Sequence, residues 1–328
     1  MTPTAKRSVE SPRSSKHQNK RQKQYSDQGS PPSTDTAYKA SNYAREMLAR
    51  GVQVSDETPT NYTDMLSHLE SRPINWLDLP GRTLDSFDTI LRRAGNEGSI
   101  QSGIVPLLMD YMGLMLNPQT MVVVDMPFSK ECKLPVQNPR DNVKRVPAPY
   151  PDVSVGLRRS LFKGHGPALY NLGDIASPIP KIPHLVFPCF AVEVKGGTGG
   201  MDAETQNGHN LAVMLFNLRQ LSVLANGEDT THATFDGVIK ACSATVTQQG
   251  TTIFCHWIEK DEETRYLSFY SRGVASFGFA GITYEGWNRA AMYLRNAISF
   301  TVQQTLGQVQ KDLLKLDERG WSYEGNQE

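Results

Sequence analysis

The spacing of apolar residues divides most of the chain into strands and helices. Between residues 152 and 158, Val153, Val155 and Leu157 alternate with polar or small residues, which is the period-two pattern of a strand. Residues 187–195 are almost continuously apolar, which favours a strand buried on both faces. Residues 285–316 repeat apolar positions at helical spacing and predict a long amphipathic helix.

The same criteria predict the remaining elements. Helices are expected at 43–49, 62–69, 82–94, 100–116 and 202–225. Strands are expected at 121–125, 237–248, 251–260 and 265–277, with a loop at 138–151. Residues 163–187 are rich in Gly and Pro and predict a connection longer than a hairpin needs, for which a plain insertion is favoured over a lid or substrate loop. This order predicts an α/β (α+β) fold in which helices flank a central mixed sheet.

The first 40 residues differ from the rest in composition. They hold eight Lys or Arg and three Asp or Glu, a net charge of +5, so the remainder carries −5 because the chain sums to zero. Few aliphatic residues are present, which predicts a disordered basic tail over 1–40. A helical extension at 41–80, a domain at 81–318 and a tail at 319–328 are expected to follow. The basic run 16–23 resembles a nuclear-localisation signal, with a solvated tail or a phosphate-contacting arm as alternatives.

Several function classes find no support in the sequence. The four cysteines are scattered without a CxxC pair, the histidines lack zinc spacing, and the glycines after Lys195 form no Walker motif. Two of the cysteines lie in apolar runs and are expected to be buried thiols. Because no signal-like or membrane-spanning apolar run is present, we expect an intracellular protein without a membrane partner. The strand aromatics Trp257, Tyr266, Phe269 and Tyr270 are expected in the core.

The chemistry that the sequence suggests centres on Asp152 and on Glu193-Val194-Lys195. Residues two apart in a strand point to the same face, so Glu193 and Lys195 project together. If the strand with Asp152 lies beside them, two carboxylates and one ammonium converge. Two carboxylates can hold a hard divalent cation, and such a site suits metal-assisted phosphodiester hydrolysis. The alternatives are a strand-edge acid at Asp152 and a surface ion pair at Glu193 and Lys195.

These motifs resemble the PD-(D/E)XK (restriction-endonuclease-like) nuclease superfamily, and in particular an uncharacterised fungal branch of it. The resemblance rests on residues 149–157, 190–197 and 204–212 and extends over roughly 80–315. It implies a restriction-endonuclease-like core that uses Mg²⁺ or Mn²⁺ and acts on nucleic acid, with DNA favoured. Asp152 and Glu193 would bind the metal, and Lys195 would position the attacking water and offset negative charge.

The resemblance also implies supporting residues from the helices. An acid is expected before the first strand, where Glu97 is the candidate and Asp110 the reserve, although Glu97 equally suits a charge complementing a helix dipole. Gln206 in the helix after Glu193 would lie near the metal or the nucleic-acid backbone. His209 is one turn away and would share its face.

Two other classes of function compete with the nuclease. The net negative body counts against tight, non-specific DNA binding and favours an inactive nuclease-fold scaffold that binds protein or nucleic acid. The presence of Asp152, Glu193 and Lys195 together favours activity. A small-molecule hydrolase using another cleft has no supporting motif.

Overall fold

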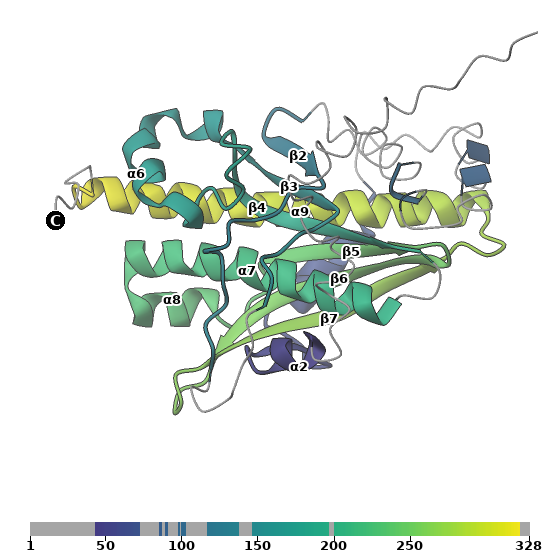
Figure 1. The fold of residues 1–328 in the computed structure, drawn as a ribbon, viewed down its shortest axis with the longest axis horizontal. Coiled ribbons are helices and arrows are strands. Elements are labelled where there is room, and N and C mark those ends of the chain that lie inside the picture. The colour runs from purple at the N-terminus through teal and green to yellow at the C-terminus, as the bar shows by residue number, and fades with distance from the viewer. Residues whose placement is uncertain are drawn as a thin grey trace, which may run out of the picture. The chain divides into compact units, whose positions relative to one another are not determined.

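A mixed sheet organises the described part of the chain (Figure 1). The computed structural model describes residues 43–72, 85–86, 89–90, 98, 100–102, 117–137, 146–196 and 200–321, which all fall in the unit Ser41–Glu328. Within them, seven strands pair in the order β1-β7-β6-β5-β4-β3-β2. Their bounds are β1 Val52–Val54, β2 Thr120–Val124, β3 Val153–Arg158, β4 Leu185–Lys195, β5 Ala241–Thr247, β6 Gly250–Lys260 and β7 Leu267–Gly278.

The strand directions confirm the mixed sheet that the sequence predicts. Strands β2, β3 and β4 form an antiparallel meander, and β5, β6 and β7 form a second one. Strands β4 and β5 are parallel, because the chain crosses over between them through helix α7 (Gly200–Asn226). Strand β1 pairs in parallel with β7 and closes the far edge. The carboxyl end of β4 therefore lies near the middle of the sheet.

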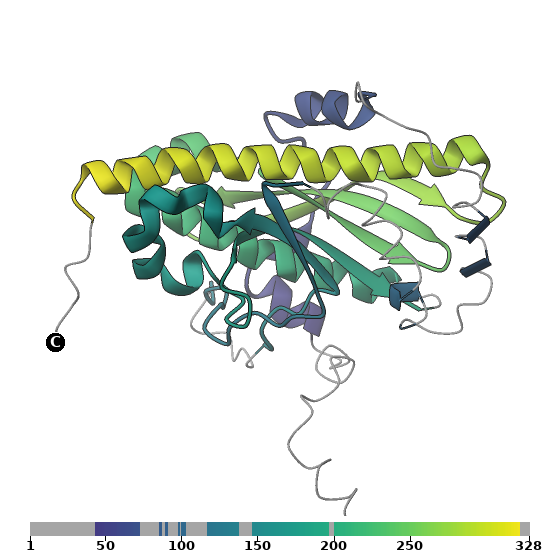
Figure 2. The same cartoon turned by 90° about the horizontal axis from the view of Figure 1, so that it is seen from above.

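Two long helices cover opposite faces of the sheet. Helix α7 donates a hydrogen bond from Asn207 to Ser243 of β5, whereas the side chain of the neighbouring Cys242 contacts Thr301 of α9 (Tyr284–Glu318). Adjacent strand residues point to opposite faces, so the two helices lie on opposite sides (Figures 1 and 2). The shorter helical segments are α2 Tyr43–Leu48, α3 Tyr62–Glu70, η2 Arg159–His165, α6 Gly166–Asn171, η3 Gly173–Ile175 and α8 Glu228–Phe235.

Most predicted elements in the described regions are confirmed to within a few residues. The connection 163–187 contains the end of η2, all of α6 and η3, and the start of β4. Three points need correction. The sequence analysis missed β1, whose three residues are too few to show a period. It also missed α8, whose Thr-rich sequence has no apolar stripe. Tyr266 is 41% exposed rather than buried, since it lies beside the turn before β7.

Other expectations fall partly or wholly outside the described residues. The basic tail 1–40 and the run 16–23 lie outside them, as do most of the predicted helices 82–94 and 100–116. The four cysteines are free and buried, as expected for the two in apolar runs. Among the helices of the described ranges, none combines the length and apolar character needed to cross a membrane.

Candidate functional site

Strand β4 carries two charged residues in an otherwise buried strand. Every residue from Leu185 to Val194 is buried, and Lys195 at the strand's end is partly exposed. Glu193 is 2% exposed, and its Oε2 lies 3.7 Å from Nζ of Lys195. The side chain of Val194 is buried on the opposite face. The strand period therefore places the carboxylate and the ammonium together, as the sequence predicts.

Asp152 lies beside Glu193 because of the antiparallel register of β3 and β4. Val153 pairs with Val192, so the residue before Val153 comes opposite Glu193. One oxygen of the Asp152 carboxylate, Oδ2, accepts a hydrogen bond of 2.6 Å from the backbone N–H of Val194. The Asp152 side chain is 7% exposed, and this bond fixes it beside the carboxyl end of β4. The structure thus brings Asp152, Glu193 and Lys195 to one position.

The electrostatics of this position favour a neutral Glu193. Burial raises the pKa of Glu193 well above its ordinary value, and the neighbouring Asp152 carboxylate, within hydrogen-bonding contact, raises it further. The ammonium of Lys195 and the amide of Asn210 oppose this shift but do not outweigh it. Glu193 therefore binds a proton more tightly than an isolated carboxylate does.

Asn210 of helix α7 fixes the second carboxylate oxygen of Glu193. Nδ2 of Asn210 donates a hydrogen bond of 2.5 Å to Oε1 of Glu193, and Asn210 is fully buried. Gln206 is also buried and lies one turn earlier on the same helix face, and its place near the metal or the nucleic-acid backbone stays a prediction. Asn210 lies within the motif segment 204–212 but is not among the predicted site residues. Its spacing of four residues from Gln206 places both on the face that meets β4.

His209 contacts a different element. Its Nδ1 lies 2.8 Å from the hydroxyl of Tyr43 in α2. Its sharing of a cleft-facing side with Gln206 stays a prediction. Burial, and then the nearby charge of Arg50, lowers the pKa of His209 to about 3. It is a neutral core histidine.

The acid expected from a preceding helix lies outside the described residues. This holds for both Glu97 and Asp110. A different residue of that region reaches the site, since Nε2 of Gln101 lies 3.4 Å from Oδ1 of Asp152 and donates to it. The sequence analysis did not single out Gln101. It had no signal beyond the predicted helix, because the contact joins residues 51 positions apart.

The donor set fits a hard divalent cation with few protein ligands. In the described ranges no three His, Cys, Asp or Glu side chains gather into a metal-binding group, so the site offers the two carboxylates Asp152 and Glu193. Oδ1 of Asn210 is buried, and among the described residues it has no hydrogen-bond partner. Mg²⁺ commonly binds through one or two carboxylates and keeps several waters. The residues present therefore fit Mg²⁺ or Mn²⁺ and do not fit a closed, all-protein cage.

A second set of hydrogen-bonded polar side chains lies deeper under α7 and has no access to a substrate. Asn207 donates to Oγ of Ser243, which lies 2.6 Å from Nε2 of His256. Ser243 is fully buried, and burial lowers the pKa of His256 to about 3. The serine and histidine have the spacing of a nucleophile and its base but pack inside the core. They connect α7 to the sheet and so keep Asn210 opposite Glu193.

Comparison with known proteins gives a family without an activity. A family model described as Domain of unknown function (DUF7924) matches residues 91–313, which is more than half of the 328 residues. The match contains Asp152, Glu193, Lys195 and Gln206, together with α7 and most of α9. A search of curated proteins found no match to the chain.

Proposed function

We propose a function for this chain from the premise that it belongs to the DUF7924 family of domains of unknown function. It hydrolyses phosphodiester bonds of nucleic acid, with DNA favoured, in a metal-dependent reaction. The activity is assigned to the carboxyl end of β4. The observation that carries the proposal is the buried Glu193, held beside the Asp152 carboxylate with Lys195 Nζ at 3.7 Å. Burying two like charges side by side is costly, and a bound cation offsets that cost.

The arrangement of strands around these residues supports the same reaction class. The meander β2-β3-β4, the crossover helix α7 and the parallel strand β5 follow the order of the restriction-endonuclease-like core that the sequence resembles. Fold resemblance does not fix a substrate, so the proposal rests on the side chains of the site.

Asp152 and Glu193 would hold Mg²⁺ or Mn²⁺ as oxygen ligands. When bound, the metal would supply Lewis-acid polarisation of the scissile phosphate. Asn210 fixes Oε1 of Glu193 by its 2.5 Å hydrogen bond, and the Val194 N–H fixes Oδ2 of Asp152. Both carboxylates are thereby oriented before any ligand arrives, which avoids reorganisation during the reaction.

Lys195 is the cationic group of the proposed site. Its side chain is 14% exposed, so it reaches the surface while its ammonium stays next to Glu193. In this position it would orient the attacking water and offset negative charge that develops on the phosphate. Gln206, one turn before Asn210, would contact the metal shell or the nucleic-acid backbone, and Glu97 retains the supporting role that the resemblance gives it.

The test is cleavage of supercoiled and linear DNA by the full chain with Mg²⁺ or Mn²⁺, compared with EDTA. We expect wild type to cleave only with metal, and Asp152→Asn, Glu193→Gln and Lys195→Met to lose activity by at least about 100-fold each, as expected when groups that stabilise transition-state charge are removed. The control Glu131→Gln alters a carboxylate that is 75% exposed and should cleave like wild type. Circular dichroism of each variant verifies folding.

Absence of cleavage by folded wild type with either metal on DNA or RNA, together with no metal-induced rise in Tm, would overturn the proposal. The inactive scaffold would then be the better interpretation. Cleavage that persists in all three site variants would also overturn it, because the active residues would lie elsewhere.

A further inference from the structure

A second candidate site lies at the opposite end of the sheet from Glu193. A cavity of about 450 Å³ is formed by the carboxyl-terminal half of α7, the end of β6 and the start of β7. Strand β6 runs antiparallel to β5, which is parallel to β4, so the end of β6 at Lys260 lies away from the end of β4 at Lys195. We refer to it as the α7–β6 cavity. Its volume is within the range of small-molecule sites.

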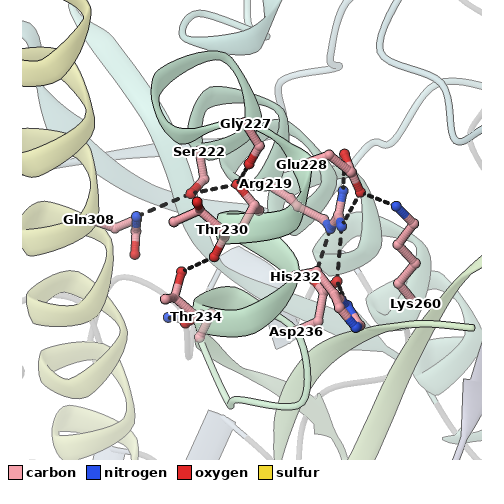
Figure 3. Close-up of polar contacts among 12 residues, drawn as sticks. Arg219, Ser222, Gly227, Glu228, Thr230, His232, Thr234, Asp236, Lys260 and Gln308 are labelled. Atoms are coloured by element: carbon pink, nitrogen blue, oxygen red, sulfur yellow. Dashed lines mark hydrogen bonds and ion pairs between the residues drawn. The ribbon is translucent and has the colours of Figure 1, made fainter. Parts of the chain in front are cut away.

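A network of ion pairs forms one wall of the α7–β6 cavity. The buried guanidinium of Arg219 binds Asp236 through Nε at 2.8 Å and Nη2 at 2.9 Å. Its Nη2 also donates to Oε1 of Glu228 at 2.7 Å. The ammonium of Lys260 contacts the same oxygen of Glu228 from the β6 side (Figure 3). The network fixes Lys260 and Glu228 at the rim without needing a ligand.

The charged residues of the α7–β6 cavity leave one positive charge that can bind an anionic ligand. Arg219 and Lys260 together match the two carboxylates Asp236 and Glu228. Arg265, at the turn before β7, adds a further positive charge to the lining, whereas the exposed acids of the same turn, Asp261, Glu262 and Glu263, are not lining residues. In the described part of the chain no carboxylate pairs with the guanidinium of Arg265. Among the same residues, the ammonium of Lys260, which has three donors, bonds to Glu228 alone. The cavity therefore favours an anionic group near Lys260 and Arg265.

Apart from Gln220, the remainder of the lining is apolar. Phe216, Val223 and Leu224 project from α7, and Ile175 and Leu267 contribute from η3 and β7. Leu224 is 40% exposed, and the Phe216 ring stands edge-on to Phe269 with centroids 6.2 Å apart, so its position is supported by the sheet. Exposed apolar surface next to unpaired donors matches a ligand with an apolar body and a polar end.

We propose that the α7–β6 cavity binds an amphipathic organic anion, with an apolar or aromatic body and a single carboxylate, sulfonate or phosphate group. The body lies over Phe216 and Leu224, and the anionic group accepts hydrogen bonds from Lys260 and Arg265. Arg219 does not contact the ligand and acts as a positioning residue that holds Glu228. This site is independent of the proposed nuclease, because it shares no residue with the Asp152–Glu193 position.

The test uses the fluorescent probe 8-anilinonaphthalene-1-sulfonate, which has an aromatic body and one sulfonate. Its neutral analogue N-phenyl-1-naphthylamine has a similar body without the charge. We expect saturable binding of one sulfonate probe per chain by wild type. Arg265→Gln and Lys260→Met should each weaken it about tenfold, as expected for a lost charged hydrogen bond, and should leave binding of the neutral probe unchanged. Leu224→Glu should weaken binding of both probes.

The matched control is Lys163→Gln, which removes an exposed lysine outside the α7–β6 cavity and should bind both probes like wild type. Equal sulfonate-probe affinity in wild type, Arg265→Gln and Lys260→Met would overturn the assignment of an anion site, even if Leu224→Glu reduced binding. Absence of saturable binding by folded wild type would overturn the site itself. The melting temperature of each variant, measured without probe, verifies that the fold is retained.

Discussion

The two charged clusters along α7 are built from the same residue types but differ in how the signs are arranged. At Arg219, two carboxylates meet cationic groups on several sides, and hydrogen bonds from Arg219 lower the pKa of Glu228 to about 2. At Glu193, two carboxylates face each other, and burial followed by Asp152 raises the pKa of Glu193. The first cluster satisfies its charges internally. The second needs a proton or an added cation, which is the property expected of a functional site.

This comparison separates stability from function in physical terms. Burying a matched network costs desolvation free energy but leaves no charge unpaired. Its main effect is to fix α7, α8 and β6 relative to one another. In a mismatched pair, two carboxylates repel each other, and a bound cation can reduce that repulsion. The two clusters should therefore respond to substitution in opposite ways.

The largest expected effect is on the matched cluster. Arg219→Met keeps the length of the side chain but leaves Asp236, which is 3% exposed, without its guanidinium partner. We expect the free energy of unfolding to fall by about 3–5 kcal/mol, which is typical when one partner of a buried ion pair is removed. Denaturant unfolding at neutral pH measures it.

The control for Arg219→Met is Arg265→Met in the same cavity. Arg265 is exposed and has no carboxylate partner among the described residues, so its loss should change stability by less than about 0.5 kcal/mol. Equal effects of the two substitutions would show that the matched network does not contribute as the comparison requires.

A smaller and opposite effect is expected at Glu193. Its folded-state pKa is raised, so between the ordinary carboxyl pKa of about 4.3 and that raised value the unfolded chain releases a proton that the folded chain keeps. Metal-free wild type should lose stability as pH rises through this window, by up to about 1.4 kcal/mol per pH unit. Glu193→Gln, which mimics the protonated acid, should remove this slope. Unfolding in EDTA across this pH range measures it.

The same unfolding measurement with added Mg²⁺ tests whether a cation can take the place of the proton on Glu193. If the cation replaces that proton, it should stabilise wild type more at higher pH and flatten the slope, with no effect on Glu193→Gln. An unchanged slope in Glu193→Gln without metal would assign the titration to another group and contradict the raised pKa of Glu193.

The mismatched cluster was more predictable from sequence than the matched one. Glu193 and Lys195 stand out because they follow a continuous apolar run, and the period of a strand places them together. That inference needs only a local pattern. The position of Asp152 needed the further assumption that its strand lies beside β4, because residues 159–184 separate β3 from β4 along the chain.

Arg219 could not be interpreted in the same way. A lone arginine in an apolar helix shows that a partner is required, but its partners Glu228 and Asp236 lie beyond the helix and are selected by the packing of α8. Asn210 and Gln101 likewise act through contacts across elements. Strand β1 depends on the edge of β7, which no local pattern of three residues can reveal.

The smallest expected effect concerns Glu228 and reverses the pH dependence of Glu193. Because its folded-state pKa is lowered to about 2, Glu228 contributes stability above the ordinary carboxyl pKa, and this is lost as pH falls from about 4.5 to about 2. Glu228→Gln should cost about 1 kcal/mol at neutral pH, a value discounted because the side chain is 35% exposed. The difference in unfolding free energy from wild type should shrink on acidification. A difference that stays constant down to pH of about 2 would show that lost packing, rather than the charge that Arg219 and Lys260 match, accounts for the effect.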